Sequence, residues 1–192
     1  MSHILACQMS FPYAAIASVS GTFSEAAFKQ CNPNHSIPVL QIHGTSDLIV
    51  PYTGSNANIS VDSCLEFWIH NNSCPNQAKV EDLPDIVSEG STVQRILYEN
   101  CASQTEVEHL KVRNGGHSWP GARSSSGIGN TNKDIDASQE IWNFFKRFKS
   151  ILSNNDDFNT GQVQISYLDP CGRSIRIQYF GKYGSLPYAI YT

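Results

Sequence analysis

The clearest strand in this sequence is IPVLQIH, residues 37–43, which runs directly into Gly44-Thr45-Ser46-Asp47. A short and nearly continuous apolar run predicts a buried strand of the kind found in open α/β sheets. Asp47 lies just past the end of that strand, where such sheets place their functional groups. An aspartate in this position can also simply cap the turn that follows. The pattern is consistent with both roles for Asp47.

A second motif is GGHSWPG, residues 115–121, which follows a strand predicted over residues 107–113. Two glycines let the backbone turn tightly before His117, and Pro120 and Gly121 end the turn. Histidine is the side chain best suited to proton transfer near neutral pH, so His117 is a candidate catalytic base. The alternative is a loop histidine that only hydrogen-bonds its neighbours.

The rest of the chain alternates between helical and strand patterns, which predicts an α/β fold. Helices are expected over residues 1–10, 61–71 and 137–152. Further strands are expected over residues 13–19, 92–98, 163–168, 174–179 and 188–191. Loops are expected over residues 22–36, 72–90 and 122–136, the last of them mobile.

A change of composition at residues 153–157, SNNDD, predicts a linker. We therefore expect an α/β domain over residues 1–152, and a linker with a short β tail over residues 153–192. The tail is too short to bury much of a core of its own.

Composition excludes several classes of protein. The 192 residues carry a net charge of −4 without a long basic run, which argues against nucleic acid or an anionic membrane as a partner. No apolar run is long enough to span a bilayer. Four histidines are scattered without the spacing of metal ligands, and we expect no metal site: His35, His43, His70 and His109. We interpret His43 as structural.

Six cysteines occur without a C-x-x-C pair, so a zinc ribbon or a redox motif is not supported. The even count at wide spacing is compatible with disulfides in an oxidising compartment and also with buried free thiols. Cys64 lies on the apolar side of its predicted helix, where a buried thiol is expected. Residues 3–21 do not form a signal peptide, because Gln8 and Pro12 interrupt the apolar run and no basic residue precedes Lys29.

Four separated motifs resemble one family. They are HGTSDLIVPY at 43–52, GGHSWPG at 115–121, SHILAC at 2–7 and CNP at 31–33. Together, and in this order, they are similar to the polyhydroxybutyrate depolymerase and feruloyl esterase group of secreted α/β-hydrolases. The resemblance covers roughly residues 1–150.

The resemblance implies that Asp47 is the acid and His117 the base of a catalytic triad, with Trp119 at the mouth of the substrate site. It also implies two disulfides, Cys74–Cys101 and Cys7–Cys31. The implied substrates are polyesters or esters of plant polysaccharides, the implied location is extracellular, and a triad esterase needs no cofactor.

The nucleophile elbow of that family, G-x-S-x-G, does not occur in this sequence. Ser2 is no substitute, since no glycines flank it. We expect Met1 to be an internal methionine and the chain to be the C-terminal portion of a longer esterase. The alternative is a non-catalytic protein that binds a polymer or sugar. Residues 153–192 also resemble the C-terminal sorting domain of proteins exported by Bacteroidetes.

Overall fold

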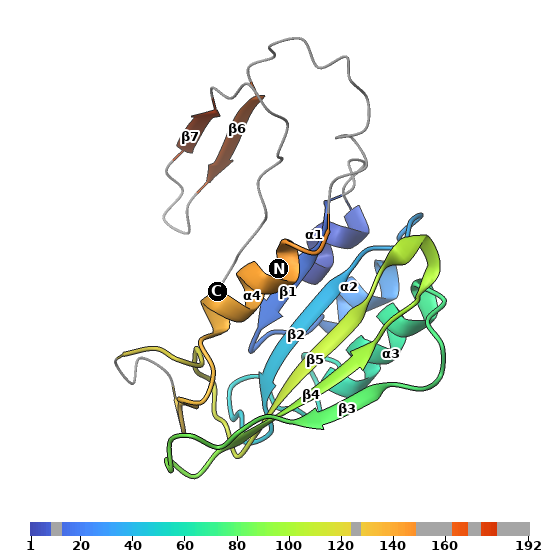
Figure 1. Ribbon diagram of the computed structural model, residues 1–192. Helices are drawn as coiled ribbons and strands as arrows, with labels where there is room; N and C mark the ends of the chain where they lie inside the picture. Colours follow the sequence, from blue (N-terminus) through green and yellow to red (C-terminus); the bar gives the residue numbers. More distant parts are fainter. Residues whose placement is uncertain (9–12, 124–127, 149–162, 169–173, 180–192) are drawn as a thin grey trace.

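The computed structural model describes residues 1–8, 13–123, 128–148, 163–168 and 174–179. Its main feature is a five-stranded mixed sheet in the order β1-β2-β5-β4-β3 (Figure 1). In that order the strands are Ile16–Val19, Val39–Gly44, Val107–Arg113, Thr92–Tyr98 and Lys79–Asp82. The α/β fold class predicted from the sequence is compatible with this architecture.

The three strands β1, β2 and β5 are parallel, whereas β4 and β3 extend the sheet in antiparallel fashion. Val39 of β2 lies opposite Ile16 of β1 and Val107 of β5. Because the three strands are parallel, their carboxyl ends meet at the same edge of the sheet. The loops that follow β2 and β5 therefore leave the sheet side by side.

Helices cover both faces of the sheet, so alternate residues of β2 belong to two different cores. Leu40 and Ile42 pack in a cluster with α4, Ala137–Phe145. Val39 packs in a second cluster with residues of α1, Ser2–Gln8, and of α3, Val61–Asn71. All six residues of β2 are buried, as its sequence predicted.

The helices α3 and α4 are each capped by the side chain of the residue that precedes the helix. The hydroxyl of Ser60 accepts a hydrogen bond from the N–H of Ser63 at the start of α3. The Asp136 carboxylate accepts from the N–H groups of Ser138 and Gln139 at the start of α4. Each cap satisfies backbone donors that have no partner inside the helix. The predicted bounds of α3 are confirmed, but α4 ends at Phe145, and residues 149–152 of the longer predicted helix lie outside the described ranges.

Two predicted loops contain regular structure. Residues 22–36 include the helix α2, Glu25–Gln30, which Ser24 caps through the N–H of Ala27. Residues 72–90 include the edge strand β3. The loop predictions were wrong at these places because neither element buries a residue, so neither leaves a periodic apolar pattern.

The structure joins Cys7 to Cys31 and Cys74 to Cys101, the two pairs implied by the resemblance. The first bond connects the end of α1 to the residue that follows α2. Cys64 is free and buried, as expected from its place on α3. Burial raises the pKa of its thiol to about 12, so it is inert near neutral pH. Cys171 lies outside the described residues.

The predicted strands of the tail are present as β6, Val163–Leu168, and β7, Ser174–Tyr179, which pair antiparallel in a sheet of their own. The strand predicted over residues 188–191 lies outside the described ranges. Where the structure describes the chain, it contains no helix that is both long enough and apolar enough to cross a bilayer.

Candidate active site

Two loops meet at the edge of the sheet where β2 and β5 end. We call residues 45–52 the acid loop and residues 114–121 the base loop. The N–H of Thr45 donates to the carbonyl of Val112, and the N–H of Ser46 donates to the carbonyl of Gly115, each at 2.9 Å. The two loops are thus joined through backbone hydrogen bonds before any side chain contributes.

Asp47 uses its two carboxylate oxygens for different purposes. Its side chain is buried, and Oδ1 accepts hydrogen bonds from the N–H groups of Ile49 at 2.9 Å and Val50 at 2.8 Å. Oδ2 lies 2.9 Å from Nδ1 of His117. The turn cap that the sequence allowed is therefore present, and it fixes the carboxylate whose other oxygen contacts the histidine.

His117 is held at its backbone as well as at its ring. Its N–H donates to the carbonyl of Ile128 at 2.7 Å, and its carbonyl accepts from the N–H of Ile128 at 3.0 Å. With Nδ1–H donated to Asp47, the free lone pair of the neutral ring is on Nε2. The side chain is 35% exposed, so this nitrogen belongs to a partly open ring rather than to a core histidine. The arrangement is that of an imidazole oriented by a buried carboxylate.

The glycines of the two motifs are needed for close approach of the loops. A Cβ at Gly44 would lie 2.3 Å from the carbonyl oxygen of Gly115, and one at Gly116 would lie 2.4 Å from that of Ile128. The sequence predicted that the glycines make the tight turn themselves. Within the base loop the residues with positive φ are Asn114, at 58°, and Gly121, at 82°. Gly121 thus turns the chain where the sequence predicted that the turn ends, whereas Gly116 is needed because no Cβ fits beside Ile128.

The loop predicted over residues 122–136 supports the base loop wherever the structure describes it. Asn130 accepts at its carbonyl from the N–H of Gly116 at 2.8 Å and from the hydroxyl of Ser118 at 3.1 Å. Asn132 is fully buried, and its amide donates to Ser91 and Asp134. Sequence reasoning missed both asparagines, since a polar loop carries no periodic signal that separates bonded from solvated residues.

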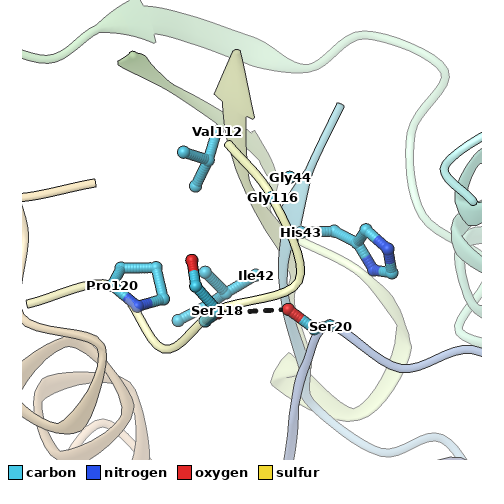
Figure 2. Close-up of a pocket in the computed structure, with 8 residues that line it drawn as sticks. All are labelled: Ser20, Ile42, His43, Gly44, Val112, Gly116, Ser118 and Pro120. Atoms are coloured by element: carbon cyan, nitrogen blue, oxygen red, sulfur yellow. Dashed lines mark hydrogen bonds between the residues drawn. The ribbon is translucent and has the colours of Figure 1, made fainter. Parts of the chain in front are cut away.

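Trp119 belongs to the base loop, but its indole turns toward α4. Its Nε1–H donates to the hydroxyl of Ser138 at 3.1 Å, and its ring packs against the core beneath α4. A small pocket lies nearby, lined by Ser20, Ile42, His43, Gly44, Val112, Gly116, Ser118 and Pro120 (Figure 2). The hydroxyl of Ser20 donates to the carbonyl of Ser118 there, which ties the end of β1 to the base loop.

Figure 2 shows Ile42 and His43 pointing to opposite sides of β2. His43 is buried, and its Nε2 lies 3.4 Å from Oδ2 of Asp47. Burial lowers the pKa of His43, which keeps its ring neutral near pH 7. Sequence reasoning assigned His43 a structural part, and no signal in the sequence indicated its contact with Asp47, because the turn after Gly44 brings the two together.

The site brings together one carboxylate and one imidazole, and no serine hydroxyl is recorded in contact with the His117 ring among the described residues. Ser2 is buried on α1, and the 192 residues contain no G-x-S-x-G motif. Over the described ranges, no three side chains of His, Cys, Asp or Glu gather closely enough to hold a metal ion.

Comparison with known proteins finds one relative. It is the protein named "Putative esterase NocK" from Nocardia uniformis subsp. tsuyamanensis, which is 26% identical over 124 residues. The match covers 57% of this chain and 36% of the relative, so the chain spans about a third of that protein's length. No protein-family model matches the chain. The sequence is thus similar to one esterase-like protein, and the narrower family resemblance seen in its motifs stays a prediction.

Proposed function

We propose that this chain carries the acid and the base of a carboxylic-ester hydrolase that works through an acyl-enzyme intermediate. The observation that carries the proposal is the 2.9 Å contact between His117 Nδ1 and Asp47 Oδ2, in which the carboxylate is already fixed by two backbone N–H groups. The nucleophile in this proposal is a serine that is not among the 192 residues.

The chemistry follows from the free nitrogen of His117. Nε2 removes the proton from the serine hydroxyl as the serine oxygen attacks the ester carbonyl, and the imidazolium that forms faces the negative charge of Asp47. His117 then returns the proton to the departing alcohol oxygen as the acyl-enzyme forms. A water molecule repeats the sequence, releases the carboxylic acid and restores the serine.

The similarity to an esterase-like protein supports the same reaction class. For the substrate we propose an ester of a polymer, either a polyhydroxyalkanoate or a feruloyl or acetyl ester of plant polysaccharide, as the resemblance of the motifs implies. The two disulfides support an extracellular location. Trp119 is proposed to border the substrate, with its ring held in place by the hydrogen bond from Nε1–H to Ser138.

The test is hydrolysis of a chromogenic acetate or butyrate ester by a protein extended upstream of Met1 through the in-frame coding sequence. His117→Ala is expected to lower kcat/KM by on the order of 10⁴-fold or more, because loss of a triad base removes most of the rate enhancement. His70→Ala, at the exposed end of α3, is the matched control and should leave the rate unchanged. Equal rates in wild type and His117→Ala would contradict the assignment.

A further inference from the structure

A line of buried polar groups crosses the face of the sheet that α3 covers. Gln41 and His43 are 0% and 1% exposed on β2, and His3 of α1 is 1% exposed beside them. Polar side chains are costly to bury unless each finds a hydrogen-bond partner. The partners here form one continuous path that ends at the acid loop.

The direction of this path is fixed at its start by Trp68 of α3. The indole Nε1–H can only donate, and it donates to Nδ1 of His3 at 3.1 Å. Nδ1 of His3 is therefore an acceptor, and in the neutral ring the proton is on Nε2. That nitrogen lies 3.0 Å from Oε1 of Gln41, to which it donates. The contact also sets the orientation of the Gln41 amide.

The Gln41 amide nitrogen then determines the tautomer of His43. Nε2 of Gln41 donates to the carbonyl of Gly21 at 3.0 Å and to Nδ1 of His43 at 3.1 Å. Since Nδ1 of His43 accepts, its Nε2 carries the proton. Nε2–H donates to the carbonyl of Val50 at 2.9 Å. Every donor along the path thus has an acceptor.

Val50 connects His43 to the acid. The N–H of Val50 donates to Oδ1 of Asp47, while its carbonyl accepts from His43. The same Nε2 of His43 lies 3.4 Å from Oδ2, the oxygen that contacts His117. His43 therefore supports the carboxylate through the backbone of Val50, and its own Nε2–H lies beside the oxygen that contacts His117.

His43 can act in this way only as a neutral ring. Its titratable neighbours are His3, Asp47, Tyr52, His109 and His117. Burial lowers the pKa of His3 and of His109 to about 4, so neither competes as a cation for Asp47 near neutral pH. The neutral ring of His43 therefore brings an N–H and no charge to Asp47.

We propose that His43 is a positioning residue of the site, and that Gln41 acts through it by fixing its tautomer. The proposal rests on the proposed function, in which Asp47 orients His117. It adds that the orientation of Asp47 is set from within the core, along Trp68, His3, Gln41 and His43. All four side chains are buried in the core.

The experiment is nitrogen-15 NMR of the histidine rings in the 192-residue protein, which does not depend on turnover. In the wild type at about pH 7.5, above the ordinary histidine pKa, His43 should be a neutral ring protonated at Nε2 alone. His117 should show a low-field Nδ1–H resonance from its bond to Asp47. A His43 ring protonated at Nδ1 would overturn the proposal before any variant is made.

Three variants separate hydrogen bonding from packing. His43→Phe keeps the ring volume and loses the N–H, so the low-field His117 resonance should be lost and His117 should become a mixture of its two tautomers. His43→Gln places an amide N–H near the position of Nε2, so the resonance should be retained. Gln41→Met leaves His43 in place but frees its tautomer, and it should weaken the resonance even if His43→Phe fails to fold.

An unchanged His117 resonance in both His43→Phe and Gln41→Met would overturn the proposal. So would a loss in His43→Gln as large as that in His43→Phe, since an N–H near the position of Nε2 would then not be what holds Asp47 and His117 together. Failure of the ester-hydrolysis test leaves these readouts intact, because they report the tautomers of His43 and His117 and not the reaction.

Discussion

At the scale of single residues, the site depends on positions where the backbone of one loop touches that of another. Gly44 ends β2 at the point where the acid loop begins, and its Cα faces the carbonyl of Gly115 in the base loop. A buried contact between two backbones leaves no flexible group that can move aside. The side-chain contact between Asp47 and His117 is therefore sensitive to a single added methyl group.

Gly44→Ala should show this sensitivity. The new Cβ would lie 2.3 Å from the carbonyl oxygen of Gly115, so the loops must separate, and we expect the free energy of unfolding to fall by about 2 kcal/mol. The low-field Nδ1–H resonance of His117 should be lost with it. Gly21→Ala is the control, because its Cβ would meet only Ser18 Oγ at 3.2 Å and Val19 O at 3.8 Å. Urea unfolding and proton NMR measure both effects, and equal stability of the two variants would contradict the argument.

At the scale of elements, an ion-pair network holds α4 and the residues after it against the sheet. Glu108 of β5 is buried, with Arg95 of β4 at 2.9 Å from one oxygen and Arg147 in contact with the other. Arg95 also reaches Glu140 of α4 at 2.8 Å. A buried carboxylate destabilises the folded state when no cation lies beside it. Removing one arginine of this network should therefore lower the free energy of unfolding, because the charge of Glu108 would be only partly compensated.

We therefore expect Arg147→Met to destabilise the protein more than a comparable change at the surface. Glu108 keeps only one of its guanidinium partners, and we expect the free energy of unfolding to fall by about 2 kcal/mol. Arg113→Met is the matched control, since its pair with Asp82 is 45% and 66% exposed and should be worth about 0.5 kcal/mol or less. Equal losses in chemical denaturation would mean that burial of Glu108 does not matter.

The fold of the whole molecule responds to pH through its buried histidines. The pKa of His3 and that of His109 are both lowered by burial from 6.5 to about 4. Between these values the unfolded chain binds the proton and the folded chain does not. The free energy of unfolding thus has its full value above about pH 6.5. It decreases as the pH falls toward 4, by on the order of 2 to 3 kcal/mol per histidine.

The measurement is urea unfolding at a series of pH values between about 7.5 and 4.5. Carboxylates also titrate near the lower end, so the variant His109→Gln isolates the contribution of one histidine. The slope of stability against pH should be smaller in this variant than in the wild type. An identical slope would show that His109 takes up its proton without unfolding.

The two disulfides act on the whole chain by restricting the unfolded state. They join residues 24 and 27 positions apart, and loops of this size correspond to about 3 kcal/mol each. We expect the double variants Cys7→Ala/Cys31→Ala and Cys74→Ala/Cys101→Ala each to lose stability of this order in non-reducing denaturation. Dithiothreitol should lower the free energy of unfolding of the wild type toward the same values. An unchanged free energy of unfolding after full reduction would contradict the prediction.

Much of this architecture can be predicted from the sequence because it depends on local pattern. The strands β4, β5, β6 and β7 and the helix α3 have the bounds that their residue periodicity predicts. Asp47 and His117 stand out because each follows a buried strand and is flanked by turn residues. The elements α2 and β3 were missed, since neither contains a fully buried residue that would give a clear periodic signal.

What the sequence determined by itself is the order of the buried elements and the places of Asp47 and His117 at the ends of two strands. Only the tertiary structure decided that Gly44 and Gly115 must touch, that Asn130 supports the base loop, and that Gln41 and His43 connect the core to Asp47. The physical reason is separation along the chain. Periodicity reports which face of an element is buried, whereas contacts between residues tens of positions apart exist only once parallel strands bring their ends to one edge of the sheet.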